Sequence, residues 1–222
     1  MIEVWGRPNS ICTQRVLWAC VETGVDFELN LASATMGPGG HVSTGEASYG
    51  GVDTPAYLAM NPNGAIPTIK DGDFVLWESN AIVAYIAAKF GAERLYGDNL
   101  ETFARASQWM SWTNEHLEPP LHVLVMELYR LPAAKRSSGA VDAAARDIAP
   151  WIEVLDRHLS TQPYVAGEAF TMGDIPAGAA AYRWTLFTAD RPATPHVNTW
   201  LERLAVRDGF KRHVEAPALH RS

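Results

Sequence analysis

Strand-like patterning in this 222-residue chain stops at Trp77, and helical patterning takes over soon afterwards. Residues 2–5 form a short apolar run, and the segment after Ser10 repeats apolar residues at helical spacing. Gly24 then fits a helix C-cap, and residues 26–31 alternate polar and apolar side chains as a half-exposed strand does. The chain therefore opens with a predicted strand, helix and strand.

A second strand pair follows a glycine-rich segment, residues 33–54, that shows no periodicity. Loops of this length are either functional lids or disordered surface segments, and the sequence leaves both readings open. Asp71-Gly72-Asp73 separates two apolar runs, which predicts a β-hairpin, and Glu78-Ser79-Asn80 then begins an apolar helix. We therefore expect residues 1–88 to form an α/β domain.

Residues 93–222 lack strand signals and repeat alanine, leucine, tryptophan and methionine at three- and four-residue spacing. This pattern predicts an all-helical second domain. Prolines interrupt it, so we expect about five or six helices, with bends or breaks near Pro119, Pro120, Pro132, Pro150, Pro163 and Pro192.

Charge and composition exclude several classes of protein. The net charge of -7, without a lysine and arginine cluster, argues against a nucleic-acid partner. Apolar runs end well before the ~18 consecutive residues that a membrane span needs, and no signal-peptide pattern opens the chain. Cys12 and Cys20 would be separated by ~12 Å along one helix, which supports neither a disulfide nor a zinc site. We expect a cytoplasmic protein with no bound metal.

Three positions in the first domain could contact a ligand. A cis Ile66-Pro67 bond would turn the backbone of Ile66 outward as an open edge for a short peptide, whereas a trans bond would be an ordinary strand start. Ser79 begins a helix whose N–H groups favour a carboxylate, and Glu78 beside it could hold an ammonium group. Taken alone, Ser79 and Ser10 each read as an ordinary helix N-cap.

Taken in order, three stretches resemble the cytosolic glutathione transferases, in particular the bacterial, theta-like members that carry a serine. They are residues 6–18 (GRPNSICTQRVLW), 57–84 (YLAMNPNGAIPTIKDGDFVLWESNAIVA) and 170–176 (FTMGDIP). The resemblance covers nearly the whole chain, and it implies a thioredoxin-like first domain, a helical second domain and a homodimer. In the third stretch it implies a capping box in which Thr171 and Asp174 bridge the first turn of a buried helix.

The resemblance also implies the reaction and its site. The family transfers glutathione, a co-substrate rather than a cofactor, to a small hydrophobic electrophile in detoxification. Ile66 beside cis Pro67 would pair with the cysteinyl backbone of glutathione, and Glu78 and Ser79 would hold its γ-glutamyl end. Ser10 would donate a hydrogen bond to the sulfur and so favour the thiolate.

The helical half would supply the electrophile pocket. Five side chains on its first long helices are candidates: Trp109, Trp112, His116, Met126 and Tyr129. We favour Trp109, Trp112 and Tyr129, although aromatic residues at helical spacing are more often part of a core. His41 in the glycine-rich segment could reach the glycyl carboxylate of glutathione, and is otherwise simply exposed.

Cys12 departs from the family pattern, because similar members often carry asparagine there. A thiol in the first turn of a helix should have a lowered pKa, so Cys12 could form a mixed disulfide with glutathione and act in thiol-disulfide reduction. A buried, inert Cys12 is the alternative. A non-catalytic binding module of the same fold is a further reading, and the presence of Ser10, Glu78 and Ser79 argues against it.

Overall fold

The computed structural model describes residues 1–33, 51–91, 95–97, 99–187 and 191–217. Most of the glycine-rich segment, including His41, lies outside these ranges, so the predictions made for it stay predictions. None of the described helices combines the length and the apolar composition that crossing a bilayer requires.

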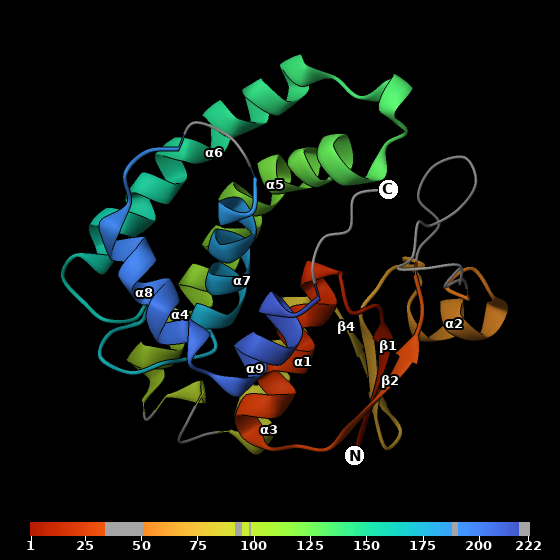
Figure 1. Cartoon of the computed structure of the whole chain (residues 1–222). Coiled ribbons are helices and arrows are strands. Elements are labelled where there is room, and N and C mark those ends of the chain that lie inside the picture. The colour runs from red at the N-terminus through yellow and green to blue at the C-terminus, as the bar shows by residue number, and fades with distance from the viewer. Residues whose placement is uncertain (34–50, 92–94, 98, 188–190, 218–222) are drawn as a thin grey trace.

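The first part of the chain forms a four-stranded mixed sheet packed with helices (Figure 1). In chain order its elements are β1 (Ile2–Gly6), α1 (Ile11–Thr23), β2 (Phe27–Leu31), α2 (Pro55–Met60), β3 (Thr68–Asp71), β4 (Phe74–Trp77) and α3 (Ser79–Phe90). The strand order is β2-β1-β3-β4, with β1 parallel to β2 and the other two pairs antiparallel. This confirms the predicted order of strands, helix and hairpin.

The register of the sheet gathers three loops at one end. Gly24 caps α1 with a φ of 70°, and Gly72 turns the chain between β3 and β4 with a φ of 63°, both in the left-handed region that favours glycine. Thr68, the first residue of β3, pairs with both Trp5 and Trp77. The loop after β1, the residues before β3 and the corner after β4 therefore meet at the same edge of the domain.

The second part of the chain is helical, as predicted. It contains α4 (Leu100–Trp112), the π-helical turn η2 (Thr113–Leu117), α5 (Glu118–Val125), the π-helical turn η3 (Met126–Arg130), the short 3-10 turn η4 (Ala133–Lys135), α6 (Ser138–Leu159), α7 (Asp174–Thr185), α8 (Pro195–Ala205), α9 (Asp208–Phe210) and the π-helical turn η5 (Lys211–Glu215). A bend or a break was expected near Pro150, and the helix does not break there: α6 continues through that proline to Leu159.

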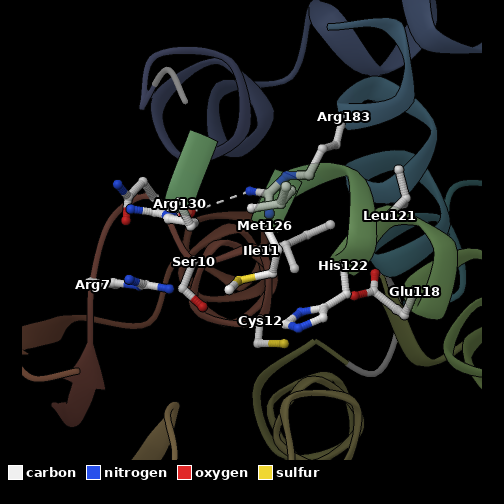
Figure 2. Close-up of a pocket in the computed structure, with 12 residues that line it drawn as sticks. Arg7, Ser10, Ile11, Cys12, Glu118, Leu121, His122, Met126, Arg130 and Arg183 are labelled. Atoms are coloured by element: carbon white, nitrogen blue, oxygen red, sulfur yellow. Dashed lines mark hydrogen bonds between the residues drawn. The ribbon is translucent and has the colours of Figure 1, made fainter. Parts of the chain in front are cut away.

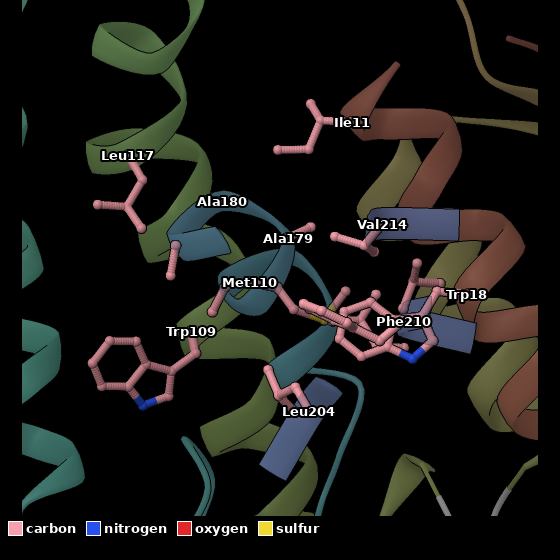
Figure 3. Close-up of a cluster of buried hydrophobic side chains, with 14 of the residues drawn as sticks. Ile11, Trp18, Trp109, Met110, Leu117, Ala179, Ala180, Leu204, Phe210 and Val214 are labelled. Carbon is pink, nitrogen blue, oxygen red and sulfur yellow. The ribbon is translucent and has the colours of Figure 1, made fainter. Parts of the chain in front are cut away.

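One apolar core joins the two parts of the chain. Trp18 of α1 is fully buried, with its ring centroid 5.2 Å from that of Phe210 and 5.8 Å from that of Phe170 (Figure 3). Gly209 lies so close that a Cβ there would be 2.3 Å from Trp18 Cδ1. Helix α1 is therefore packed closely against the helical half of the chain.

Polar contacts fix α1 against the helical half at three levels. Near its start, Arg183 Nη2 of α7 donates to Gln14 Oε1 at 2.9 Å. Arg15, whose side chain is 1% exposed, forms an ion pair with Glu118 of α5. Near its end, Glu22 pairs with Arg207, with Nη2 to Oε2 at 2.6 Å. These contacts set where the first residues of α1 sit relative to α5 and α7.

The predicted capping box is present at the start of α7. The Asp174 carboxylate accepts the backbone N–H of Thr171 at 2.9 Å and that of Val165 at 3.0 Å, and it also accepts the indole N–H of Trp200 at 3.0 Å. The Thr171 hydroxyl lies 3.3 Å from the same carboxylate. Asp174 is fully buried, and its role is to join the loop before α7 to α8.

Candidate functional site

Ser10 occupies the N-cap position of α1, but its hydroxyl does not cap the helix. Its backbone has the extended geometry of an N-cap residue, with φ -83° and ψ 123°, and its carbonyl accepts Gln14 N at 2.8 Å. Serine at this position normally accepts a backbone N–H in the first turn, and here no such side-chain bond forms. The hydroxyl is therefore available to a ligand at the positive end of the α1 dipole.

A cavity of about 160 Å³ opens beside Ser10 (Figure 2). Its walls come from the β1–α1 loop, the first turn of α1, α5 with the following π-helical turn, and the end of α7. The lining residues are Arg7, Asn9, Ser10, Ile11, Cys12, Glu118, Leu121, His122, Val125, Met126, Arg130 and Arg183. A concave site between two structural units, with a few polar groups among apolar ones, is typical of a small-molecule pocket.

Three guanidinium groups share this cavity. Burial, together with the positive charges of Arg130 and Arg183, lowers the pKa of Arg7 to about 9. Burial lowers the pKa of Arg183 to about 10, and its side chain is 7% exposed. Burial also lowers the pKa of Arg130. The pocket is electropositive although the chain as a whole carries a charge of -7.

The corner between β4 and α3 has the features expected of an anchor for a charged group. Glu78 is exposed and has a φ of 73°, a left-handed conformation that costs about 1–3 kcal/mol for a residue with a side chain. Ser79 is the first residue of α3, is 5% exposed and hydrogen-bonds with Cys12. Both residues therefore lie at a helix N-terminus next to the first turn of α1.

The Ile66-Pro67 bond is cis, as the family resemblance implied. The loop around it is held by two side chains that the sequence analysis did not single out. Tyr57 Oη donates to Ala65 O at 2.7 Å, and Asn61 Nδ2 donates to the same carbonyl at 2.9 Å. Ile66 precedes the first paired residue of β3, and no hydrogen bond within the described chain involves its backbone.

The lowered pKa expected for Cys12 is contradicted by the structure. Burial raises the pKa of the thiol, and the nearby Glu118 carboxylate adds to that effect, while Arg15 and Ser79 oppose it. The helix dipole is therefore outweighed by loss of solvent around the sulfur. Cys12 lies in the pocket wall beside Ser10, but as a protonated thiol at neutral pH.

The favoured aromatic residues are not brought to this pocket. Trp109 packs on Trp112 and His158, with ring centroids 4.8 and 4.4 Å away, and belongs to the core (Figure 3). Tyr129 is buried 6.0 Å from the ring of Phe187. Of the five candidates on these helices, Met126 is the one that lines the cavity, and His116 stacks on the Trp151 ring at 3.9 Å.

Sequence reasoning missed the guanidinium groups of the pocket. Arg7, Arg130 and Arg183 are far apart in the sequence and belong to no shared motif. Arg7 lies within the stretch that resembles the family, but its neighbours there gave no sign of a charged cavity. Only the packing of α5 and α7 on the start of α1 makes them one group.

Comparisons with known proteins point to one family over both parts of the chain. Residues 9–89 match the family model for the N-terminal domain of glutathione S-transferase, and residues 117–208 match the model for its C-terminal domain. The chain is 33% identical over 221 residues to glutathione S-transferase GstB of Escherichia coli, covering 98% of this chain and 99% of that protein. It is 34% identical to glutathione S-transferase 3 of Zea mays, covering 97% and 94%.

A solved structure gives the same result. The theta class glutathione S-transferase from Xanthomonas axonopodis pv. citri, crystallised with glutathione bound, superposes with a TM-score of 0.87 at 37% identity, covering 99% of both chains. The similarity therefore extends from the sheet through the last helices.

Proposed function

This chain belongs to the cytosolic glutathione S-transferase family, and from that premise we propose that Ser10 activates the thiol of glutathione for attack on a small electrophile. The observation that carries this assignment is the Ser10 hydroxyl, which sits at a helix N-terminus without capping it and faces a cavity between the two parts of the chain. The protein is thus a glutathione transferase of the serine type.

The proposed chemistry requires only a modest shift in the pKa of the glutathione thiol. An unperturbed thiol has a pKa of about 8.5, and each unit of lowering corresponds to about 1.36 kcal/mol in favour of the thiolate. A hydrogen bond from a hydroxyl to a charged sulfur contributes about 1.5–3 kcal/mol, and the helix dipole adds about 0.3–1 kcal/mol. Ser10 and α1 together would therefore lower the thiol pKa by about one to three units.

The rest of glutathione would lie along the edge where the three loops of the sheet meet. Ile66, beside cis Pro67, offers an unpaired backbone edge for the cysteinyl residue of glutathione. Ser79 and the N-terminus of α3 would hold the γ-glutamyl carboxylate, and Glu78 its ammonium group. The hydrogen bond between Ser79 and Cys12 brings this anchor next to the first turn of α1.

The electrophile would enter the cavity on the other side of Ser10, against Leu121, Val125 and Met126. Residues 1–88 would then be the glutathione-binding domain, and residues 93–222 the domain that shapes the electrophile pocket, with α3 extending two residues past the first boundary.

We also propose a cytoplasmic homodimer that needs glutathione as co-substrate and no further cofactor. His41 stays a proposed contact of the glycyl carboxylate.

Conjugation of glutathione to a generic aryl halide tests the assignment of Ser10. We expect Ser10→Ala to lower kcat/KM at least ~tenfold, because a charge-assisted hydrogen bond to the thiolate is lost. Ser10→Thr keeps the hydroxyl and should retain more activity than alanine. The ultraviolet absorbance of bound thiolate, followed against pH, should show a higher glutathione pKa in the alanine variant.

Two further variants make the result decisive. Cys12→Ser should keep most of the activity, and Ser138→Ala, an exposed serine at the start of α6, serves as the matched control. A larger loss in Cys12→Ser than in Ser10→Ala would transfer the role to Cys12 and to thiol-disulfide chemistry. An unchanged thiolate pKa in Ser10→Ala would remove the proposed hydrogen bond.

A further inference from the structure

We propose that Arg183 of α7 is a positioning residue for Ser10. Its guanidinium group holds the loop before α1 and the first turn of that helix, and in this way aims the Ser10 hydroxyl at the thiol of glutathione. This inference rests on the proposed role of Ser10. It adds to the same site a residue from the helical half, 174 positions away from the loop in the sequence.

Arg183 contacts the chain on both sides of Ser10. Its Nη2 donates to Gln14 Oε1 at 2.9 Å and to Asn9 O at 3.4 Å. Asn9 precedes Ser10 in the loop, and Gln14 N donates to Ser10 O at 2.8 Å. In Figure 2 the Arg183 side chain extends from α7 toward this loop. One guanidinium nitrogen therefore joins the residue before Ser10 to the residue that binds the Ser10 carbonyl group.

Ser10 has no side-chain bond to α1 that would fix its own conformation. Its hydroxyl caps no backbone N–H group, and its own N–H donates to Arg7 O at 3.1 Å, within the same loop. A hydrogen bond to a thiolate weakens steeply when its distance or angle departs from the optimum. A displacement of about 1 Å at a reacting group costs up to ~100-fold in rate. Support for the loop from another part of the chain therefore bears directly on catalysis.

Helix α7 is a rigid base for such a support. Every residue from its start to Trp184 is buried, with the exception of Tyr182. A Cβ at Gly178 would be 2.5 Å from Leu204 Cδ1 and 3.3 Å from Trp18 Cη2, so the helix is pressed against both α8 and α1. A side chain on a close-packed helix has little freedom to move with the loop that it holds.

Stability alone does not account for an arginine at this position. The Arg183 side chain is 7% exposed, and burial lowers its pKa to about 10, so it is still charged at neutral pH. Apolar residues stabilise such a position as well as a buried charged group does. A basic residue in the last turn also favours the helix dipole, but an exposed one does the same. Directional hydrogen bonds to the loop are what this buried guanidinium group supplies.

A double-mutant cycle with the aryl halide tests the proposal. We expect Arg183→Met to lower kcat/KM ~tenfold or more and to raise the pKa of bound glutathione, because the hydroxyl no longer meets the sulfur correctly. In a Ser10→Ala background the same substitution should change kcat/KM less than ~twofold, since the hydroxyl that it positions is gone. Arg157→Gln is the matched control, an exposed arginine in the last turn of α6, and it should change neither background.

A second pair of substitutions separates positioning from folding. Arg183→Met leaves the Gln14 Oε1 acceptor buried without its donor, which lowers stability. Adding Gln14→Leu replaces both partners by apolar side chains, so thermal unfolding should show that most of the loss in Tm is recovered. We expect kcat/KM of this double variant to remain at least ~tenfold below wild type. Arg183→Lys keeps a charged donor and should give an intermediate loss, again only where Ser10 is present.

Two results would overturn the positioning role of Arg183. The first is an equal loss from Arg183→Met with and without the Ser10 hydroxyl, because a direct effect of the positive charge on the sulfur, or a loss of folded protein, does not depend on that hydroxyl. The second is full activity in the variant that combines Gln14→Leu with Arg183→Met. In both cases the effect of Ser10→Ala stands. Failure of Ser10→Ala to affect the aryl halide would instead overturn the role of Ser10.

Discussion

Asp174 offers the most quantitative test of how this structure is held together. The carboxylate is fully buried and accepts hydrogen bonds from Thr171 N, Val165 N and Trp200 Nε1 at 2.9–3.0 Å, with the Thr171 hydroxyl at 3.3 Å. Asp174→Ala leaves three fixed, buried N–H donors without an acceptor. Each costs about 1–3 kcal/mol.

The loss is partly offset because the carboxylate itself is unfavourable at neutral pH. Burial raises the pKa of Asp174 to about 6, which corresponds to a cost of about 3 kcal/mol for the ionised group at about 1.36 kcal/mol per pKa unit. With about 2 kcal/mol for each of the three donors and a small term for the cavity, the net loss is about 3–4 kcal/mol. For a chain of this length that lowers Tm by about 6–16 °C.

Urea unfolding followed by circular dichroism, together with thermal unfolding, measures both quantities. Asp174→Asn keeps one carbonyl oxygen for Val165 N and Trp200 Nε1 and removes the buried charge, so we expect it to lie within about 1 kcal/mol of wild type. Activity per folded molecule should be unchanged in both variants, since Asp174 does not line the cavity beside Ser10. An alanine variant that loses less than about 1 kcal/mol would refute the reasoning.

Two further predictions concern stability. The pKa of Asp174 is about 6 in the folded chain and near 3.8 when unfolded, so the folded state binds the proton more tightly. The free energy of unfolding therefore declines as pH rises from about 4 to about 6. Asp174→Asn should abolish that part of the slope when urea titrations are repeated at several pH values. Gly209→Ala would place a Cβ 2.3 Å from Trp18 Cδ1, and it should lower the free energy of unfolding by about 1–3 kcal/mol and change the tryptophan fluorescence. Gly139→Ala in α6, where the nearest neighbour of the added Cβ is 3.8 Å away, should not destabilise the chain. Equal effects of the two substitutions would contradict the close packing of Trp18.

Local signals were sufficient wherever the structure depends on neighbours in the sequence. Gly24 and Gly72 mark turns that need a left-handed backbone, and the alternation and helical spacing of the residues on either side of these turns predict the strands and α1. The Thr171 and Asp174 pair was predictable for the same reason, because the cap and its partner lie within one turn. Pro150 is the exception: packing of α6 holds the helix through a proline that alone predicts a break.

The sequence by itself therefore determined the α/β and helical halves, the family, and the positions of Ser10, Ile66, Glu78 and Ser79 at the ends of predicted elements. Tertiary structure alone decided what faces Ser10. Helical spacing shows that Trp109 and Met126 lie on apolar faces, but not which neighbour each face meets, and packing sent Trp109 to the core and Met126 to the cavity. The same packing gathered three distant arginines, because charge proximity depends on distance in space, which no local pattern records.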